Sequence, residues 1–227
     1  MAPPPEPLSR EDYLRRWSAL HGGMDPASNR LVLWWLSVVH VLARPLAAAG
    51  ASPNAVTTLG LAVVVGGVGA AWAGGWWLLL AGLLMLISGL MDNLDGAVAV
   101  MTDRATKWGY VYDSVVDRAA DVLFLVALWL AGAPAGVCVV AGVLTFVQEY
   151  TRARAGAAGM SEVGVVSVWE RPSRVLVTGM FLFADGLYGG DWVMLAVLGA
   201  WVSVALAVVG VVQVLVMVRR RVRDLPA

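Results

Sequence analysis

The chain has 227 residues, of which 59% are hydrophobic and 14% charged, and its formal net charge at neutral pH is zero. This composition excludes an ordinary soluble domain and predicts an all-α integral membrane protein. The single cysteine, Cys138, lies in an apolar run, which excludes an internal disulfide framework and a Cys-x-x-Cys metal motif. We therefore expect Cys138 to be a small core residue.

The N-terminal part of the chain predicts helices at the membrane surface. Residues 1–8 are Pro-rich and lack the apolar core of a signal peptide, so they predict a disordered tail. Ser9 can cap a helix with apolar residues at helical spacing, expected to lie either on the cytoplasmic membrane surface or on the protein itself. Arg44 and Pro45 interrupt the next apolar segment, 29–49, which favours a kinked interfacial helix over a full crossing.

Six stretches after residue 51 predict transmembrane helices, because each is apolar and long enough for a membrane span. They cover residues 54–73, 76–100, 109–131, 135–155, 170–184 and 192–218. On this arrangement Asp185 begins the last outer loop, 185–191. All sixteen lysines and arginines fall on the side of the terminal segments and the two inner loops, and none lies in the three outer loops, so the positive-inside rule places both termini in the cytoplasm.

The predicted organisation therefore has four parts. They are a disordered tail (1–8), cytoplasmic or interfacial helices (9–50), a six-helix transmembrane domain (51–218) and a basic cytoplasmic tail (219–227).

Four acidic residues stand out in this apolar chain, and they form two pairs. Asp92 and Asp95 are three residues apart, and Asp113 and Asp117 are four apart, so each pair lies on one helical face. Converging carboxylates near a bilayer repel one another and lose hydration unless cations hold them together. Carboxylate oxygens without a cysteine or histidine cluster suit hard ions such as Mg²⁺, Mn²⁺ or Ca²⁺. The sequence therefore predicts a divalent-metal site at the cytoplasmic edge of the membrane.

Small residues beside the acids leave room for a ligand. Gly96 follows Asp95 directly, and Ala99 lies about one turn further along the same helix. A flat or phosphorylated ligand could lie against this face.

The acidic stretch resembles the signature of the CDP-alcohol phosphotransferase family of membrane enzymes that make phospholipids. The matching positions are Asp92-x-x-Asp95-Gly96-x-x-Ala99, followed by Gly109-x-x-x-Asp113-x-x-x-Asp117. One position departs, because Val100 stands where the family pattern has arginine. Arg104 lies four residues later, and its guanidinium would reach the same face if the helix continued for one more turn.

The resemblance implies an enzyme that transfers a phosphatidyl group from CDP-diacylglycerol to a small alcohol and releases CMP, in a bacterial plasma membrane. It implies two bound Mg²⁺ or Mn²⁺ ions, with Asp117 as general base. The implied metal ligands are Asp92, Asp95, Asp113 and Asp117. The implied nucleotide-binding residues are Asn54, Thr57, Asp95, Gly96, Ala99 and Gly109. The implied partners are membrane lipids and a second copy of the chain, and no nucleic acid.

Three arginines near the inner ends of the predicted spans bear on the acceptor. The resemblance implies that Arg152, Arg171 and Arg174 bind an acceptor phosphate, as guanidinium groups suit phosphate oxygens. The acceptor would then be a phosphorylated polyol such as glycerol 3-phosphate or inositol phosphate. The alternative is that these arginines are topology anchors.

Two other polar residues, His40 and Asp121, are expected to be structural, with Asp121 pairing with Arg118 or with a basic residue of a neighbouring helix. The alternatives are a ligand or acid-base role for His40, and for Asp121 a role as hydrogen-bond acceptor behind the metal ligands. Two other functions remain open. Val100 leaves room for a catalytically weak relative that binds nucleotide or lipid without turnover. An ion-coupled transporter is the other alternative, although its carboxylates would usually lie at the membrane midplane.

Overall fold

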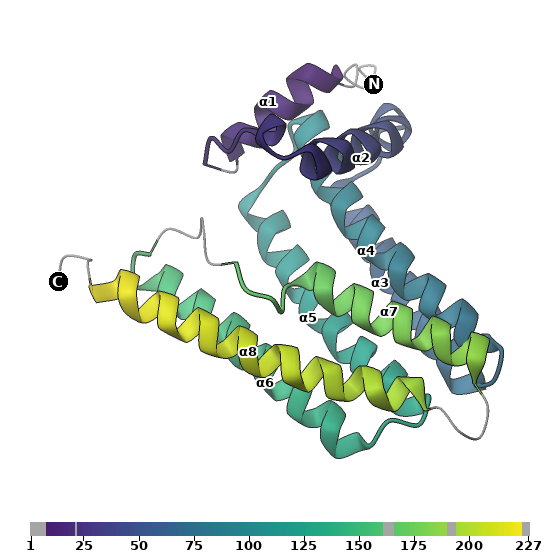
Figure 1. Cartoon of the computed structure of the whole chain (residues 1–227). Coiled ribbons are helices and arrows are strands. Elements are labelled where there is room, and N and C mark those ends of the chain that lie inside the picture. Colours follow the sequence, from purple (N-terminus) through teal and green to yellow (C-terminus); the bar gives the residue numbers. More distant parts are fainter. Residues whose placement is uncertain (1–7, 21, 161–165, 190–193, 224–227) are drawn as a thin grey trace. The chain divides into compact units, whose positions relative to one another are not determined.

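The computed structural model describes residues 8–20, 22–160, 166–189 and 194–223, and these residues form helices and no strand (Figure 1). The predicted all-α class is confirmed. The elements in chain order are α1 (Arg10–Leu20), the 3₁₀ helix η1 (Pro26–Ser28), α2 (Arg30–Ala48), α3 (Pro53–Ala73), α4 (Trp77–Thr102), α5 (Lys107–Leu130), α6 (Ala135–Ala157), α7 (Arg171–Tyr188) and α8 (Leu195–Arg223). The predicted disordered tail, apart from Leu8, lies outside the described residues.

Side-chain caps explain where three of these helices begin. The hydroxyl oxygen of Ser9 accepts a 3.2 Å hydrogen bond from the backbone N–H of Asp12. The side-chain oxygen of Asn29 accepts from the first turn of α2, and the hydroxyl of Thr106 accepts a 2.9 Å bond from the N–H of Gly109 in α5. First-turn N–H groups have no partner within their own helix, so each cap stabilises its helix start by about 1 kcal/mol.

The chain forms two compact units. The first contains residues Met1–Ala62 and Gly89–Asp117, and the second contains Val63–Ser88 and Arg118–Ala227. The long helices α3, α4 and α5 therefore each contribute one segment to each unit.

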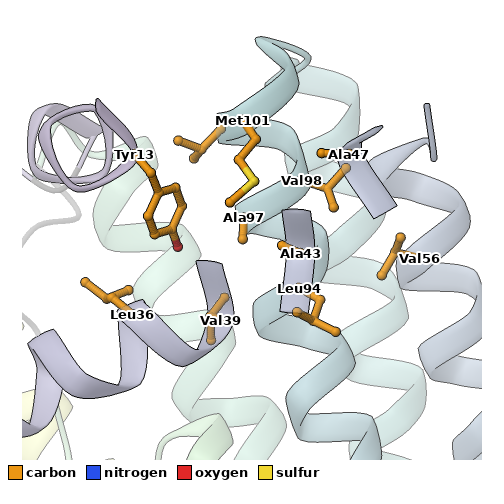
Figure 2. Packing of buried hydrophobic residues seen from close by; sticks show 11 residues of the cluster. Tyr13, Leu36, Val39, Ala43, Ala47, Val56, Leu94, Ala97, Val98 and Met101 are labelled. Carbon is orange, nitrogen blue, oxygen red and sulfur yellow. The ribbon is translucent and has the colours of Figure 1, made fainter. Parts of the chain in front are cut away.

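The core of the first unit is an apolar cluster built from α1, α2, α3 and α4 (Figure 2). Tyr13, Val39 and Val98 are each at most 1% exposed in it. Two buried alanines of α2, Ala43 and Ala47, keep that face small, which permits close approach of neighbouring helices. The cluster holds α1 and α2 against the half of α4 that carries the acidic residues.

His40 belongs to the same region, and its contacts agree with the structural role expected for it. It is 7% exposed. Its Nε2 atom lies 3.1 Å from the carbonyl oxygen of Leu8, and its ring centroid lies 5.4 Å from that of Tyr13.

The second unit consists of closely packed helices, with α8 contacting both α6 and α7. The segment of α4 in this unit approaches α7 at Gly82. A methyl group added there would lie 2.5 Å from the carbonyl oxygen of Gly179, so only glycine permits this approach. Cys138 is buried, as predicted.

In the part of the chain that the structure describes, four helices are long and apolar enough to cross a membrane: α2, α3, α4 and α8. They support an integral membrane protein. The six helices α3 to α8 correspond to the six predicted spans, but α5, α6 and α7 are not among these four. Conversely, α2 is among them even though it contains Arg44 and Pro45. The six-span count and the interfacial position of the N-terminal helices therefore stay predictions.

The placement of Asp185 in an outer loop is wrong. Helix α7 continues to Tyr188, and Asp185 is buried in its last turns. Its Oδ1 atom accepts a 2.7 Å hydrogen bond from the backbone N–H of Leu195 and a 3.4 Å bond from that of Ala196. The carboxylate therefore caps the N-terminus of α8, where a negative charge is favourable.

Candidate active site

Three of the four predicted metal ligands come together in the first unit. Asp92 on α4 and Asp113 and Asp117 on α5 each offer a carboxylate oxygen, and these oxygens all lie within 4.8 Å of one another. All three residues are half-buried. Asp113 and Asp117 share a face because they are one helical turn apart. Oxygens this close repel when ionised, and a hard divalent cation such as Mg²⁺ or Mn²⁺ suits such a ligand set.

The fourth predicted ligand, Asp95, lies outside this group of three. It is 6% exposed, and its Oδ2 atom accepts a 2.6 Å hydrogen bond from the hydroxyl of Thr57. This bond joins α3 to α4 and fixes the direction of the Asp95 carboxylate. The metal-ligand role of Asp95 stays a prediction, and so does the nucleotide-binding role of Thr57.

A cavity of about 370 Å³ opens beside the acidic residues, within the size range of small-molecule sites. Six predicted nucleotide-binding residues line it, together with two further predicted metal ligands. The fold brings these eight residues together from separate parts of the sequence. The lining positions predicted from the sequence are Asn54, Thr57, Asp92, Asp95, Gly96, Ala99, Gly109 and Asp113.

Two glycines in this lining have different roles. A methyl group added to Gly96 would meet no atom within 4 Å, so this face of α4 is open, as the sequence predicts. At Gly109, a methyl group would lie 3.1 Å from the hydroxyl oxygen of Thr106 and 3.4 Å from the side-chain oxygen of Asn54. Glycine at this position therefore lets the first turn of α5 approach the start of α3.

The N-terminal helices also line the cavity, which the motif gives no reason to expect. Tyr13 and Trp17 of α1 and Leu36 and Val39 of α2 are among its walls. Burial raises the pKa of Tyr13 to about 12, so its phenol stays protonated at neutral pH. The aromatic residues at helical spacing in α1 were the sequence signal that could have indicated this role. Helical spacing alone, however, does not tell which surface a helix covers.

The position that departs from the family pattern is part of the packed core. Val100 is 9% exposed and belongs to the apolar cluster of the first unit. The condition for Arg104 to replace the missing arginine on the same helical face, one more turn of α4, is not met, because α4 ends at Thr102 and Asp103 follows with a positive φ of 55°. Arg104 nevertheless lines the cavity, and its guanidinium donates a 3.4 Å hydrogen bond to the carbonyl oxygen of Gly50.

The second unit contains a separate cluster of arginines and carboxylates. Arg174 is 3% exposed, and its guanidinium donates a 2.9 Å hydrogen bond to Asp121 and a 2.6 Å bond to Glu149. Arg152 donates to Glu170 through both terminal nitrogens, one bond being 2.7 Å long. Two-point contacts of this kind fix guanidinium orientation.

The same cluster settles the partners of Asp121. Arg118 lies 3.1 Å from its carboxylate, and Arg171 lies 4.0 Å from it. Pairing of Asp121 with Arg118 and with basic residues of a neighbouring helix, as expected from the sequence, is confirmed. The structure thus brings Arg152, Arg171 and Arg174 into one charged cluster.

Comparison with known proteins places the chain in a family. Residues 50–212 match the model of the CDP-alcohol phosphatidyltransferase family. An uncharacterized protein of Aquifex aeolicus is 37% identical over 56% of this chain and 65% of its own length. A phosphatidylinositol phosphate synthase of Mycobacteroides abscessus is 30% identical over 78% of this chain and 81% of its own length.

Solved structures agree with this match. The crystal structure of Mycobacterium tuberculosis phosphatidylinositol phosphate synthase with CDP-DAG bound has a TM-score of 0.67 and 26% identity, covering 80% of this chain and 94% of that one. A second crystal structure of that synthase, in complex with manganese and citrate, has a TM-score of 0.66 and 27% identity, covering 79% and 88%. The chain is an integral membrane protein that belongs to the CDP-alcohol phosphatidyltransferase family of transferases.

Proposed function

We propose that this protein is a metal-dependent phospholipid synthase. It would transfer a phosphatidyl group from CDP-diacylglycerol to a hydroxyl of inositol phosphate and release CMP. The observation that carries this proposal is the meeting of Asp92, Asp113 and Asp117 oxygens within 4.8 Å of one another. Family membership and the substrate in the CDP-DAG complex of the M. tuberculosis synthase support the donor.

The acidic residues would have two roles, metal binding and proton transfer. Asp92, Asp95, Asp113 and Asp117 would hold two Mg²⁺ or Mn²⁺ ions, and the manganese complex of the M. tuberculosis synthase supports that choice of metal. Bound metal offsets the negative charge of the diphosphate and stabilises the departing phosphate. The hydrogen bond from the hydroxyl of Thr57 would hold the Asp95 carboxylate in place for metal binding.

Asp117 would act as general base toward the acceptor. In this reaction the acceptor hydroxyl oxygen forms a bond to the phosphorus that carries diacylglycerol. The bond from that phosphorus to the oxygen it shares with the CMP phosphate breaks, and CMP leaves with that oxygen. The hydroxyl proton passes to a carboxylate oxygen of Asp117.

The nucleotide would occupy the cavity of the first unit. Asn54, Thr57, Gly96, Ala99 and Gly109 contribute its walls. The open face at Gly96 would take the part of the nucleotide nearest the metal, because the adjacent residue Asp95 is one of the proposed ligands.

The acceptor phosphate would bind at the arginine cluster of the second unit. Four guanidinium groups share three carboxylates there, which leaves an excess of positive charge in the cluster. Arg152, Arg171 and Arg174 would exchange part of their contact with carboxylates for contact with phosphate oxygens. Several relatives that carry the name phosphatidylinositol phosphate synthase favour inositol phosphate over glycerol 3-phosphate.

The proposed placement in the membrane follows the distribution of positive charge. Residues 51–218 would form a six-helix catalytic domain with its site on the cytoplasmic side of a bacterial plasma membrane, and both termini would be cytoplasmic. The enzyme is also proposed to act as a homodimer.

The test is CMP release by the purified protein in detergent. CDP-diacylglycerol is supplied with Mn²⁺ or Mg²⁺ and, in separate reactions, inositol phosphate, glycerol 3-phosphate, inositol or serine. We expect CMP with inositol phosphate, and only when a divalent ion is present. Turnover in the presence of a strong chelator, or CMP release with a different acceptor alone, would contradict the proposal.

A second function has one observation in its favour, since Val100 is an apolar core residue where the family pattern has arginine. A catalytically weak relative would bind CDP tightly and release no CMP with any acceptor. Measuring CDP affinity on the same preparation separates it from an active synthase.

A further inference from the structure

The cavity in the first unit is completed by a helix outside the part of the chain that matches the family. The match covers residues 50–212, whereas α1 ends at Leu20. Tyr13 and Trp17 of α1 nevertheless line the same cavity as Asp92, Asp95 and Asp113. The match to the family model therefore includes the acidic lining residues and leaves the aromatic lining residues of α1 without an assigned role.

Several contacts hold α1 in this position. The guanidinium of Arg10 donates hydrogen bonds of 2.8 and 3.0 Å to the hydroxyl of Ser37 in α2. Arg16 lies 3.3 Å from a carboxylate oxygen of Asp103 in the turn after α4. Tyr13 is 1% exposed within the apolar cluster. A wall anchored on both neighbouring elements can present a side chain to a ligand in a fixed place.

The lining of this cavity combines two kinds of side chain that suit the two parts of a nucleoside diphosphate. Its carboxylates suit a metal-bound diphosphate. Its aromatic side chains from α1 suit the base, because flat bases stack on aromatic rings. Tyr13 is buried against His40, with ring centroids 5.4 Å apart. Trp17 packs against the apolar cluster but is only half-buried, and it lines the cavity.

We propose that Trp17 is a substrate-binding residue whose indole stacks on the base of the bound cytidine nucleotide, which makes α1 part of the nucleotide site. This inference rests on the proposed function, because it takes a cytidine diphosphate group as the occupant of the cavity. It adds a specificity-determining residue that lies outside residues 50–212, which match the family model.

The experiment separates the base from the diphosphate. Binding of CDP and of inorganic pyrophosphate is measured by isothermal titration calorimetry in detergent, at one fixed concentration of free Mn²⁺. The variants are Trp17→Ala, Trp17→Leu, which keeps apolar bulk against the core, and Trp17→Phe, which keeps an aromatic face. The matched control is Trp34→Ala, because Trp34 on α2 is 59% exposed and is not among the described lining residues.

Stacking predicts a loss that depends on the base. Trp17→Ala and Trp17→Leu should weaken CDP binding roughly tenfold and leave pyrophosphate binding unchanged. Trp17→Phe should retain most of the CDP affinity, and Trp34→Ala should change neither affinity. If both ligands weaken equally in Trp17→Leu, the indole supports the fold of the cavity and the stacking role is wrong.

Tyr110 is the alternative platform, since it lines the cavity and is 59% exposed. A base-dependent loss in Tyr110→Ala with wild-type behaviour in Trp17→Ala would overturn the assignment to α1. If the wild-type protein binds CDP and the Trp17 variants keep the wild-type ratio of CDP to pyrophosphate affinity, only this inference fails. If the wild-type protein binds neither ligand, the proposed function fails as well.

Discussion

The hydroxyl of Thr57 on α3 donates a 2.6 Å hydrogen bond to Oδ2 of Asp95 on α4, and both residues are buried. This bond connects the two helices at the level of the acidic residues. It also satisfies a carboxylate oxygen that would otherwise lose its solvation inside the protein.

Removing that hydroxyl should destabilise the protein. Thr57→Val keeps the side-chain shape but leaves Asp95 Oδ2 without this donor, and we expect a cost of roughly 1–3 kcal/mol in the free energy of unfolding. Thermal unfolding in detergent should show a lower midpoint, together with slower CMP release. Thr57→Ser keeps the donor and should stay close to wild type. Equal behaviour of the valine and serine variants would mean that the bond contributes nothing.

Removing one charge from the acidic group should affect metal-free and metal-bound protein in opposite ways. Asp113→Asn takes away a metal ligand, so Mn²⁺ affinity measured by calorimetry should fall about tenfold or more. The same change relieves repulsion among three close carboxylates, so the metal-free thermal midpoint should rise or stay constant. Glu11→Gln, on the exposed face of α1, is the control and should change neither quantity. Unaltered Mn²⁺ affinity in Asp113→Asn would remove Asp113 from the metal site.

Gly96 offers a test of the open face of α4. An added methyl group meets no protein atom within 4 Å, and alanine is the better helix former by about 1 kcal/mol. Gly96→Ala should therefore raise the unfolding midpoint slightly and still weaken CDP binding, because the methyl group enters the space of the ligand. Gly136→Ala on α6, where a methyl group also meets nothing, should leave CDP binding unchanged. Full CDP affinity in Gly96→Ala would place the nucleotide elsewhere.

Arg104 is the one cationic side chain among the described residues that line the cavity. It faces a site proposed to hold a diphosphate, so Arg104→Gln should weaken CDP binding by roughly three- to tenfold, a modest effect because the residue is exposed. Arg104→Lys should recover part of the loss. The control is Lys107→Gln at the start of α5, which removes a nearby charge outside the cavity. Calorimetry with equal CDP affinity for Arg104→Gln and wild type would exclude a phosphate contact.

The buried arginine of the second unit should matter more for stability than an exposed one on a neighbouring helix. Arg174→Leu removes the most deeply buried guanidinium that Asp121 and Glu149 share and leaves Arg118 as their remaining common partner. Loss of one partner from a buried ion pair costs roughly 3–5 kcal/mol, and the remaining contact with Arg118 places this variant toward the lower end. The unfolding midpoint should drop clearly. Arg154→Gln removes an exposed charge from α6 and should shift it little. Similar midpoints for the two variants would show that the Arg174 network does not stabilise the fold.

The sequence by itself determined the helical elements and the identity of the acidic motif. Apolar length predicted the helices from α3 to α8, and capping residues such as Ser9 marked helix starts. The spacing from Asp92 to Asp117 indicated two pairs of carboxylates, because residues three or four apart share a face of any helix. Such local geometry depends only on neighbours in the chain.

Only the tertiary structure decided which of these faces meet. It grouped Asp92 with Asp113 and Asp117, whereas Asp95 accepts a hydrogen bond from Thr57, although the four carboxylates look alike in the sequence. It also made Asp185 of α7 the cap of the N-terminus of α8 and placed Trp17 in the lining of the cavity. Periodicity defines a face but not the partner it packs against, because that partner is chosen by packing and charge pairing among distant segments.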